Sequence, residues 1–152
     1  KESIIKFKLH GNSFKEIDLY ESFSVIPLCL IQNFVKYSIT EIDIKIEDSS
    51  GGVDVVITSQ GPLIEESEIQ DIFKKGYRGI NAKKGSYEGM GIGLYTAQEV
   101  AKAHGFDLKV VSADAGYLSE NIPIANNKFY FTVPSSENPE ITSRQFKKRR
   151  RR

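Results

Sequence analysis

The chain has 152 residues, of which 39% are hydrophobic and 27% charged, with one cysteine and no tryptophan. This length fits one domain with a single core, and no stretch approaches the roughly 20 apolar residues of a membrane-spanning helix or has a signal-peptide pattern. A lone cysteine forms no intrachain disulfide, which suits a reducing compartment such as the cytoplasm. Because the sequence opens at Lys1 rather than methionine, we expect a fragment or a processed form.

The net charge of +1 conceals an uneven distribution. Residues 144–152 hold seven of the 21 basic side chains and no acidic one, so the rest of the chain has a net charge of about −6. An acidic body argues against a strong nucleic-acid surface outside the tail. We expect residues 1–134 to form one domain and residues 135–152 a disordered basic tail, which is either simply solvated or an arm for phosphates or a membrane surface.

The first forty residues predict two strands and a helix. Residues 3–9 alternate apolar and basic side chains, which predicts a strand, and residues 16–20 predict a short second one. Ser24 is a candidate N-cap for a helix that begins near Val25 and ends near Ser38. Helical spacing predicts that its apolar face is formed by Val25, Leu28, Ile31, Phe34 and Val35.

The middle of the chain predicts a hairpin, two helices and a long loop. Residues 41–47 and 53–57 flank a glycine-rich turn, which is typical of an antiparallel hairpin. Residues 65–73 predict a short amphipathic helix. The glycine-bearing, basic stretch 74–89 has no clear period, and a loop of this length is usually functional or mobile. Residues 91–104 predict a helix that a following glycine terminates.

Two further strands, at 108–112 and 127–133, complete the pattern. The order of the predicted elements is typical of an α+β fold: strands, helix, hairpin, helix, loop, helix and strands. We expect a two-layer sandwich in which helices cover one face of a mixed sheet.

The first helix contains a polar group at helical spacing. Asn33 lies three residues before Lys36 and four before Tyr37, so the three share a face. A carboxamide oxygen is a hard ligand suited to Mg²⁺, which takes few protein ligands beside substrate phosphates, and a lysine offers charge to phosphate. A plain solvated face is the alternative.

Three later segments have features of a phosphate-binding site. Gly61 follows the 53–57 strand and permits close approach of a flat ligand, while the Ser59 hydroxyl both donates and accepts. Alternate glycines in 89–94 bare main-chain N–H groups at a helix start, with the spacing of neither the P-loop nor the dinucleotide motif. The basic loop 74–89 is suited to closing as a lid. Ordinary turns and a plain surface loop are the alternatives.

Taken in order, these segments resemble the ATP-binding domain shared by histidine kinases, gyrase-type topoisomerases, heat-shock-90-type chaperones and mismatch-repair proteins, the GHKL superfamily. The likeness is greatest to the histidine kinase catalytic domain and covers about residues 20–134. It implies a Bergerat-type fold with a mobile ATP lid. The matching segments are Asn33–Ser38 for the N box, Ser59–Ile64 for the first glycine box, Ile72–Gly79 for the lid start, Gly89–Leu94 for the second glycine box, and Ala103–Gly105 for the end of the following helix.

This resemblance implies Mg²⁺-dependent transfer of the ATP γ-phosphoryl group to a histidine outside this fragment, within two-component signalling. The implied partners are an acceptor-histidine domain, in the same or another chain, and a response regulator. Asn33 would coordinate the metal, Asn33 and Lys36 would be the catalytic residues, and His104 would be structural. The implied nucleotide-binding residues are Asn33, Lys36, Tyr37, Ser59, Gly61, Leu63, Tyr77, Arg78, Gly89, Met90, Gly91, Ile92, Gly93 and Leu94.

Some positions depart from the family pattern. Ser59 stands where the family has an aspartate that accepts from the adenine amine, and Leu63 replaces the second glycine of that box. Cys29 stands one helical turn before Asn33, where hydrolytic branches have a glutamate base, so we expect slow hydrolysis. The chain's only histidines, His10 and His104, lack an acceptor-helix context.

These departures keep other functions open. One is a degenerate nucleotide sensor whose lid controls a partner without turnover. Another is an ATPase that drives conformational change, and a third is an α+β interaction domain that binds no nucleotide.

Overall fold

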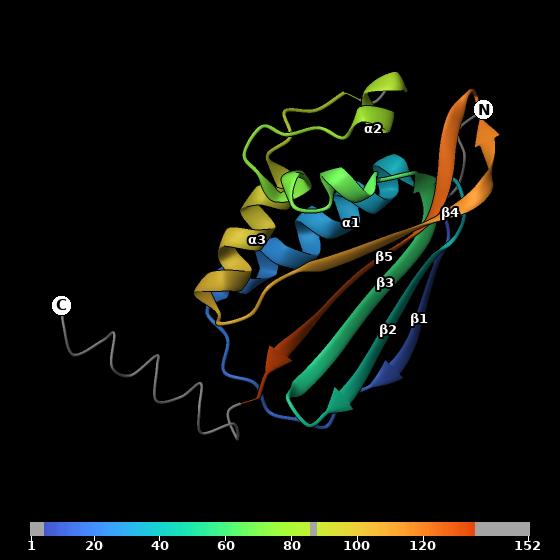
Figure 1. Cartoon of the computed structure of the whole chain (residues 1–152). Coiled ribbons are helices and arrows are strands. Elements are labelled where there is room, and N and C mark those ends of the chain that lie inside the picture. The colour runs from blue at the N-terminus through green and yellow to red at the C-terminus, as the bar shows by residue number, and fades with distance from the viewer. Residues whose placement is uncertain (1–4, 86–87, 136–152) are drawn as a thin grey trace.

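A computed structural model describes residues 5–85 and 88–135 and has two layers (Figure 1). A five-stranded mixed sheet forms one layer, and α1 and α3 lie side by side on one of its faces. This confirms the predicted fold class. The elements are β1 (Phe7–Asn12), η1 (Glu21–Ser24), α1 (Val25–Tyr37), β2 (Ile42–Ser49), β3 (Gly52–Pro62), η2 (Glu66–Glu68), η3 (Asp71–Phe73), α2 (Ile80–Lys84), α3 (Gly93–Ala103), β4 (Lys109–Ser119) and β5 (Ile122–Pro134).

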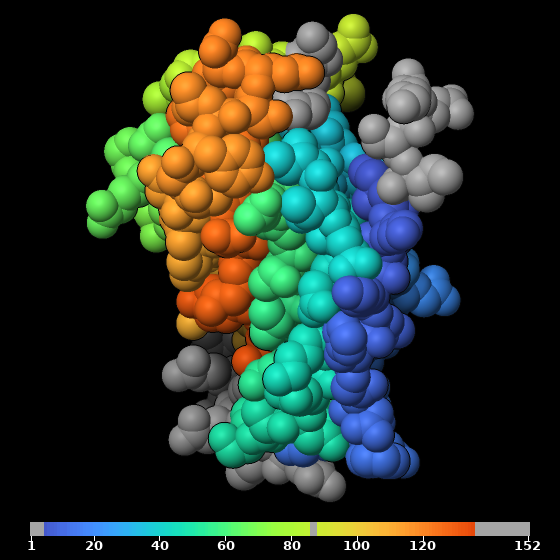
Figure 2. Space-filling model, turned by 90° about the vertical axis from the view of Figure 1, so that its right-hand side faces the viewer, coloured from blue at the N-terminus to red at the C-terminus, as the bar shows by residue number. Residues whose placement is uncertain are grey.

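The strands follow the order β1-β2-β3-β5-β4 across the sheet. β1 is parallel to β2, whereas the other neighbouring pairs are antiparallel. Glu120 and Asn121 both have positive φ, of 50° and 65°, as a two-residue turn between β4 and β5 requires. The face turned away from the helices is open, with the strands in this order across it (Figure 2).

The core lies between the sheet and the two long helices. α1 buries Ile26, Leu30 and Phe34, and Phe34 packs edge-on against Phe129 of β5 at a centroid distance of 5.4 Å. The predicted apolar face of α1 is therefore largely wrong. Among its members Phe34 is buried, Val25 is half-buried, and Leu28, Ile31 and Val35 are exposed. α1 contacts both the sheet and α3, so the direction of packing, not the apolar spacing alone, decides its buried side.

The N-terminal part differs from the sequence prediction in three ways. The first strand spans Phe7–Asn12, so it excludes residues 5–6 and extends past residue 9, while residues 3–4 of the predicted strand lie outside the described residues; all six strand residues are exposed because β1 is a sheet edge. Residues 16–20 form no strand. Ser24 makes no side-chain cap, because it lies in the η1 turn and its hydroxyl donates to the Glu21 carbonyl at 2.9 Å. The bounds of the helix that follows are confirmed.

Further along, the predicted strands exist but are longer, and the predicted helix over 65–73 is two 3₁₀ turns. A capping box between Glu65 and Glu68 stabilises the first turn and closes it early. The predicted 91–104 helix begins at Gly93, and Gly105, at φ +86°, follows its end as predicted. The loop 74–89 contains the short helix α2, which the sequence did not indicate.

Residues 136–152 lie outside the described residues, so the disordered tail stays a prediction. In the described part of the chain no helix has the length and apolarity needed to cross a bilayer.

Candidate functional site

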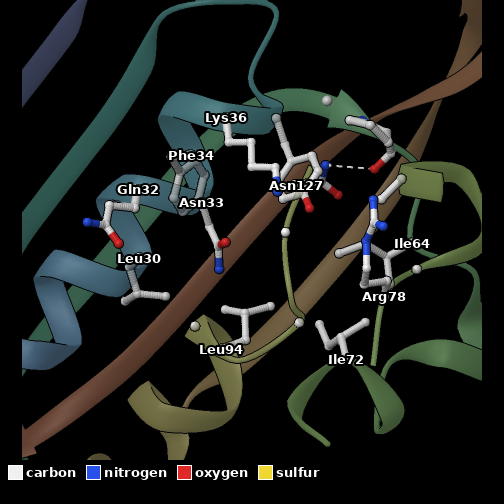
Figure 3. Close-up of a pocket in the computed structure, with 18 of the residues that line it drawn as sticks. Leu30, Gln32, Asn33, Phe34, Lys36, Ile64, Ile72, Arg78, Leu94 and Asn127 are labelled. Carbon is white, nitrogen blue, oxygen red and sulfur yellow. Dashed lines mark hydrogen bonds between the residues drawn. The ribbon is translucent and has the colours of Figure 1, made fainter. Parts of the chain in front are cut away.

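A cavity of about 340 Å³ lies between α1, the end of β3, the 74–92 segment and the start of α3 (Figure 3). Every one of the fourteen residues that the resemblance implied for nucleotide binding lines it. The structure thus brings together segments that are far apart in the sequence. The further lining residues are Leu30, Gln32, Phe34, Ser38, Pro62, Ile64, Ile72, Gly79, Ala82, Asn127 and Phe129.

Asn33 faces the start of α3 across this cavity. A Cβ atom added to Gly93 would lie 3.8 Å from both Oδ1 and Nδ2 of the Asn33 carboxamide. In Figure 3 the Asn33 side chain points from α1 toward Leu94 on α3. The carboxamide and the α3 N-terminus, where main-chain N–H groups are unpaired by the helix, therefore border the same space.

Lys36 lies beside the glycine-rich segment. A Cβ atom on Gly89 would lie 2.5 Å from Lys36 Nζ, which is itself 4.9 Å from the centre of the Tyr37 ring. A side chain at position 89 would thus displace the flexible end of Lys36 from its present position. Close contact between the lysine and a bare backbone places one positive charge at this end of the cavity.

Gly91 brings the glycine-rich segment into contact with Gly76 and Tyr77 of the 74–89 segment. It has φ +67°, and a Cβ atom there would lie 2.4 Å from the Tyr77 carbonyl oxygen. The Gly91 carbonyl accepts a hydrogen bond from the N–H of Gly76 at 3.0 Å. Glycine is therefore required at position 91 for two reasons: L side chains rarely adopt this positive φ, and a Cβ atom would overlap the Tyr77 carbonyl oxygen.

At the other end of the cavity, the end of α1 lies against β3. A Cβ atom on Gly61 would lie 2.6 Å from the Tyr37 carbonyl oxygen, and the N–H of Ile39 donates to the Gln60 carbonyl at 2.8 Å. These backbone contacts bring the Ser38 and Ser59 Oγ atoms to 2.7 Å. We call these two groups the hydroxyl pair.

Asn127 is a buried site residue that the sequence reasoning missed. In the sheet register it lies between Ser59 of β3 and Ser112 of β4. Its Oδ1 accepts from the Ser112 hydroxyl at 2.7 Å, and its Nδ2 donates to the Pro62 carbonyl at 3.1 Å. The signal was present, since Asn127 stands in phase with the buried Phe129 and Phe131, where an apolar residue is normal.

Glu68 holds the start of the 74–89 segment, the predicted lid, and was also missed. This carboxylate is 2% exposed and accepts from the Tyr77 hydroxyl and from the Ile80 N–H, both at 2.7 Å. The hydrogen bond to Glu68, with burial as a smaller cause, raises the pKa of Tyr77 to about 12. Asn81, 1% exposed, donates to the Leu63 carbonyl at 2.9 Å and so fixes α2 to the segment after β3.

The basic residues of the predicted lid do not act alike. Arg78 lines the cavity, across from Lys36 in Figure 3. Lys74 forms an ion pair with Asp71 at 2.6 Å. Lys83 lies over the Tyr77 ring, and Lys84 donates to Asn81 Oδ1 at 2.8 Å; neither lines the cavity.

Cys29 and the two histidines lie away from the cavity. Burial raises the pKa of the Cys29 thiol, so it is a poor substitute for a carboxylate base. His104 is 5% exposed, with Nδ1 2.8 Å from the Val100 carbonyl and its ring edge-on to Tyr20 and Phe23. His10 is exposed on β1 beside Asp43. His104 thus has the structural environment expected of it.

The electrostatics of the cavity favour a polyanion. Lys36 and Arg78 line it, and no aspartate or glutamate is among the described residues that do so. The described part of the chain also has no cluster of three or more histidine, cysteine, aspartate or glutamate residues that would hold a metal alone. A cation bound here would have one protein ligand, the Asn33 carboxamide. Its remaining ligands would come from phosphates and water.

The fold and the cavity define an α+β domain with a basic pocket between its helices and its sheet, and the sequence gives its family. Residues 27–137 match the family described as histidine kinase-, DNA gyrase B-, and HSP90-like ATPase. The match covers more than half of the chain, so the chain belongs to this ATP-binding family. The relatives that its sequence matches include a sensor protein and a sensor histidine kinase.

Sensor protein CutS of Streptomyces coelicolor is 30% identical over 96 residues, which are 61% of this chain and 23% of that protein. Sensor histidine kinase YkoH of Bacillus subtilis is 31% identical over 83 residues, which are 55% of this chain and 18% of that protein. The alignments therefore span less than a quarter of these relatives' own lengths.

Solved structures show the same fold. The mycobacterial sensor histidine kinase MprB superposes with a TM-score of 0.68 and 24% identity, covering 86% of this chain and 84% of that one. The catalytic domain of histidine kinase ThkA gives a TM-score of 0.62 and 22% identity, covering 86% and 80%.

Proposed function

We propose that this domain binds ATP with Mg²⁺ in the cavity and transfers the γ-phosphoryl group to a histidine supplied from outside the domain. The observation that supports this most is the shared border of the cavity, where the Asn33 carboxamide faces the start of α3 and Lys36 Nζ lies beside Gly89. These groups come from segments that are far apart in the sequence. A triphosphate is a ligand that uses all of them.

Asn33 and Lys36 have the central roles in this proposal. The Asn33 carboxamide oxygen would be the protein ligand of the metal, which supplies charge neutralisation to the phosphates when bound. Lys36 and Arg78 would contribute point charge and a planar guanidinium to phosphate oxygens. The main-chain N–H groups of residues 89–94 would donate to the same oxygens.

The other lining residues would hold the nucleoside. Tyr37 and Tyr77 would border it, and Ser59, Gly61 and Leu63 would line the base end of the cavity. Met90, Ile92 and Leu94 would flank the phosphate end with their backbone.

In the reaction, the P–O bond between the γ-phosphorus and the β–γ bridging oxygen breaks, and a P–N bond to the acceptor imidazole forms. ADP leaves with the bridging oxygen. This chain contributes position and charge rather than a covalent intermediate. Because His104 is buried and His10 is on the far β1 edge, the acceptor belongs to another domain or chain.

We place this reaction in the cytoplasm, in two-component signalling, with a response regulator as the final phosphate acceptor. The unpaired Cys29 is consistent with a reducing compartment. A non-catalytic nucleotide sensor is the second candidate, supported by the hydroxyl pair that stands in place of a base-binding carboxylate. A slow ATPase is less favoured, because Cys29 has a raised pKa and does not line the cavity.

Calorimetric titration with ATP, with and without Mg²⁺, tests the site. We expect binding that tightens with Mg²⁺, and absence of heat at millimolar ATP would refute every nucleotide-based proposal. Phosphotransfer is tested with labelled ATP and an added acceptor-histidine domain. Acid-labile, base-stable label on that domain supports the kinase, and binding without any label supports the sensor.

A further inference from the structure

The end of the cavity near Ser59 offers neutral polar groups. Three neighbouring strands place Ser59, Asn127 and Ser112 in one row of the sheet, in phase with residues that face the helices. The preceding row, Ile57, Phe129 and Val110, is buried and apolar. Since no acidic residue is among the described lining residues, a ligand group here meets hydroxyls, a carboxamide or the main chain.

Much of the hydrogen-bonding capacity of this row is used within the protein. The Ser112 hydroxyl accepts from the Ile64 N–H at 3.0 Å and donates to Asn127 Oδ1 at 2.7 Å. Asn127 Nδ2 donates to the Pro62 carbonyl at 3.1 Å, as the dashed line in Figure 3 shows. Asn127 and Ser112 therefore act as a fixed floor, and the hydroxyl pair is the adaptable group.

A count of protons shows how the hydroxyl pair differs from a carboxylate. Two hydroxyls have two protons, and the bond between Ser38 and Ser59 uses one of them. The second proton is available to an acceptor, and oxygen lone pairs are available to a donor. Rotation about each Cβ–Oγ bond exchanges these roles. A carboxylate at position 59 would only accept, and it would repel a carbonyl oxygen.

We infer that the hydroxyl pair reads position 6 of the purine, and that the site takes 6-oxo purine nucleoside triphosphates as well as 6-amino ones. A 6-amino purine donates its exocyclic N–H and accepts at N1. A 6-oxo purine accepts at O6 and donates its N1–H. The hydroxyl pair complements both patterns. This inference rests on the proposed function, because it requires the base to lie at this end of the cavity.

Calorimetric titrations of the chain with ATP and with inosine triphosphate, both with Mg²⁺, test the inference. Inosine triphosphate has the 6-oxo group and N1–H and otherwise matches ATP. We expect the two dissociation constants to agree within about tenfold, the cost of about one mismatched hydrogen bond. A larger preference for ATP would overturn the inference and leave the ATP site intact. If neither nucleotide binds, the proposed function itself fails.

A charge substitution sharpens the test. Ser59→Asp places an acceptor-only group in the pair, and we expect it to raise the preference for ATP over inosine triphosphate by at least about tenfold. Thr58→Asp is the matched control, since the adjacent strand position points to the other face of the sheet and does not line the cavity. An unchanged preference in Ser59→Asp, or an equal rise in Thr58→Asp, would overturn the inference. The ratio is measured within each variant, so a partly unfolded sample does not alter it.

Discussion

The cavity has two ends that are built differently: the end at Ser59, where we propose the base (the base end), and the end at Gly89, where we propose the phosphates (the phosphate end). At the base end, Asn127 is held by hydrogen bonds to the adjacent strands, the hydroxyl pair joins the end of α1 to β3, and Gly61 contacts α1. At the phosphate end, Gly89 and Gly91 present bare backbone with positive φ. One end is fixed by a sheet and the other depends on loop conformation. Substitutions at the two ends should therefore change different properties.

The largest expected effect is at the junction of α1 and β3. Gly61→Ala places a Cβ atom 2.6 Å from the Tyr37 carbonyl oxygen, a backbone atom that moves only with the helix. We expect a loss of about 2–3 kcal/mol in the free energy of unfolding, measured by urea denaturation. Gly51→Ala is the control, because its Cβ would make an ordinary 3.5 Å contact with Thr132. Equal stability of the two variants would contradict this packing.

At the phosphate end the expected effect is on ligand binding rather than folding. Asn33→Ala removes the carboxamide, and we expect the Mg²⁺-dependent part of ATP affinity to fall by about tenfold or more, with unchanged urea stability. Asn12→Ala is the control, because it removes an exposed carboxamide on β1 that does not line the cavity. Calorimetry at several Mg²⁺ concentrations measures the change. Retention of the full Mg²⁺ dependence in Asn33→Ala would remove its assigned role.

The hydrogen bond from Tyr77 to Glu68 makes the free energy of unfolding depend on pH. We expect its effect to be smaller than those at the two ends of the cavity. The folded-state pKa of Tyr77 is about 12, above the ordinary value of 10, so the unfolded chain loses this proton first as pH rises. Its contribution to stability is full below pH 10 and is lost between about pH 10 and 12. We expect Tyr77→Phe to remove that part of the decline in stability.

Urea denaturation at several pH values measures this decline, and Tyr130→Phe is a matched control on β5. In Glu68→Gln the Tyr77 pKa should fall toward 10, which absorbance titration of the phenolate measures. A Tyr77 pKa that stays near 12 in Glu68→Gln would exclude Glu68 as its main cause.

The smallest effect is expected at Cys29. Burial raises the pKa of its thiol, so the midpoint of the pH dependence of alkylation should lie above that of the same thiol in the urea-unfolded chain. Cys29→Ser should leave ATP affinity unchanged within about twofold. A midpoint below that of the unfolded chain would mean that a nearby positive charge outweighs burial.

The sequence predicted what depends on local pattern. Alternation in 41–47, the bounds of α1 and the glycines of 89–94 are each readable within one segment, and their order indicated the family. The structure brings these segments to one cavity, whereas the roles assigned to Asn33 and Ser59 stay predictions.

The parts that were missed depend on tertiary contacts. The buried side of α1 depends on where α3 packs, so Leu28 and Ile31 are exposed despite their helical spacing. Glu68 had no distinguishing local pattern, because its burial follows from Tyr77 and Ile80 folding back onto it. Asn127 stands out in the sequence as a polar residue at an inward-facing position of an apolar strand. Its hydrogen-bond partners, Ser112 and Pro62, lie on the neighbouring strands and are not indicated by the local sequence.

The row formed by Ser59, Asn127 and Ser112 has a consequence for how such domains diversify. Its members are bonded mainly to one another and to adjacent backbone, and none of them contacts the glycines that border Asn33 and Lys36. If the base lies at Ser59 as proposed, one or two side-chain replacements in this row would alter nucleobase preference without a change in the segment around Gly89 and Gly93. On this proposal, the preference for a phosphate donor and the chemistry of transfer are determined by separate groups of residues and are therefore able to change separately.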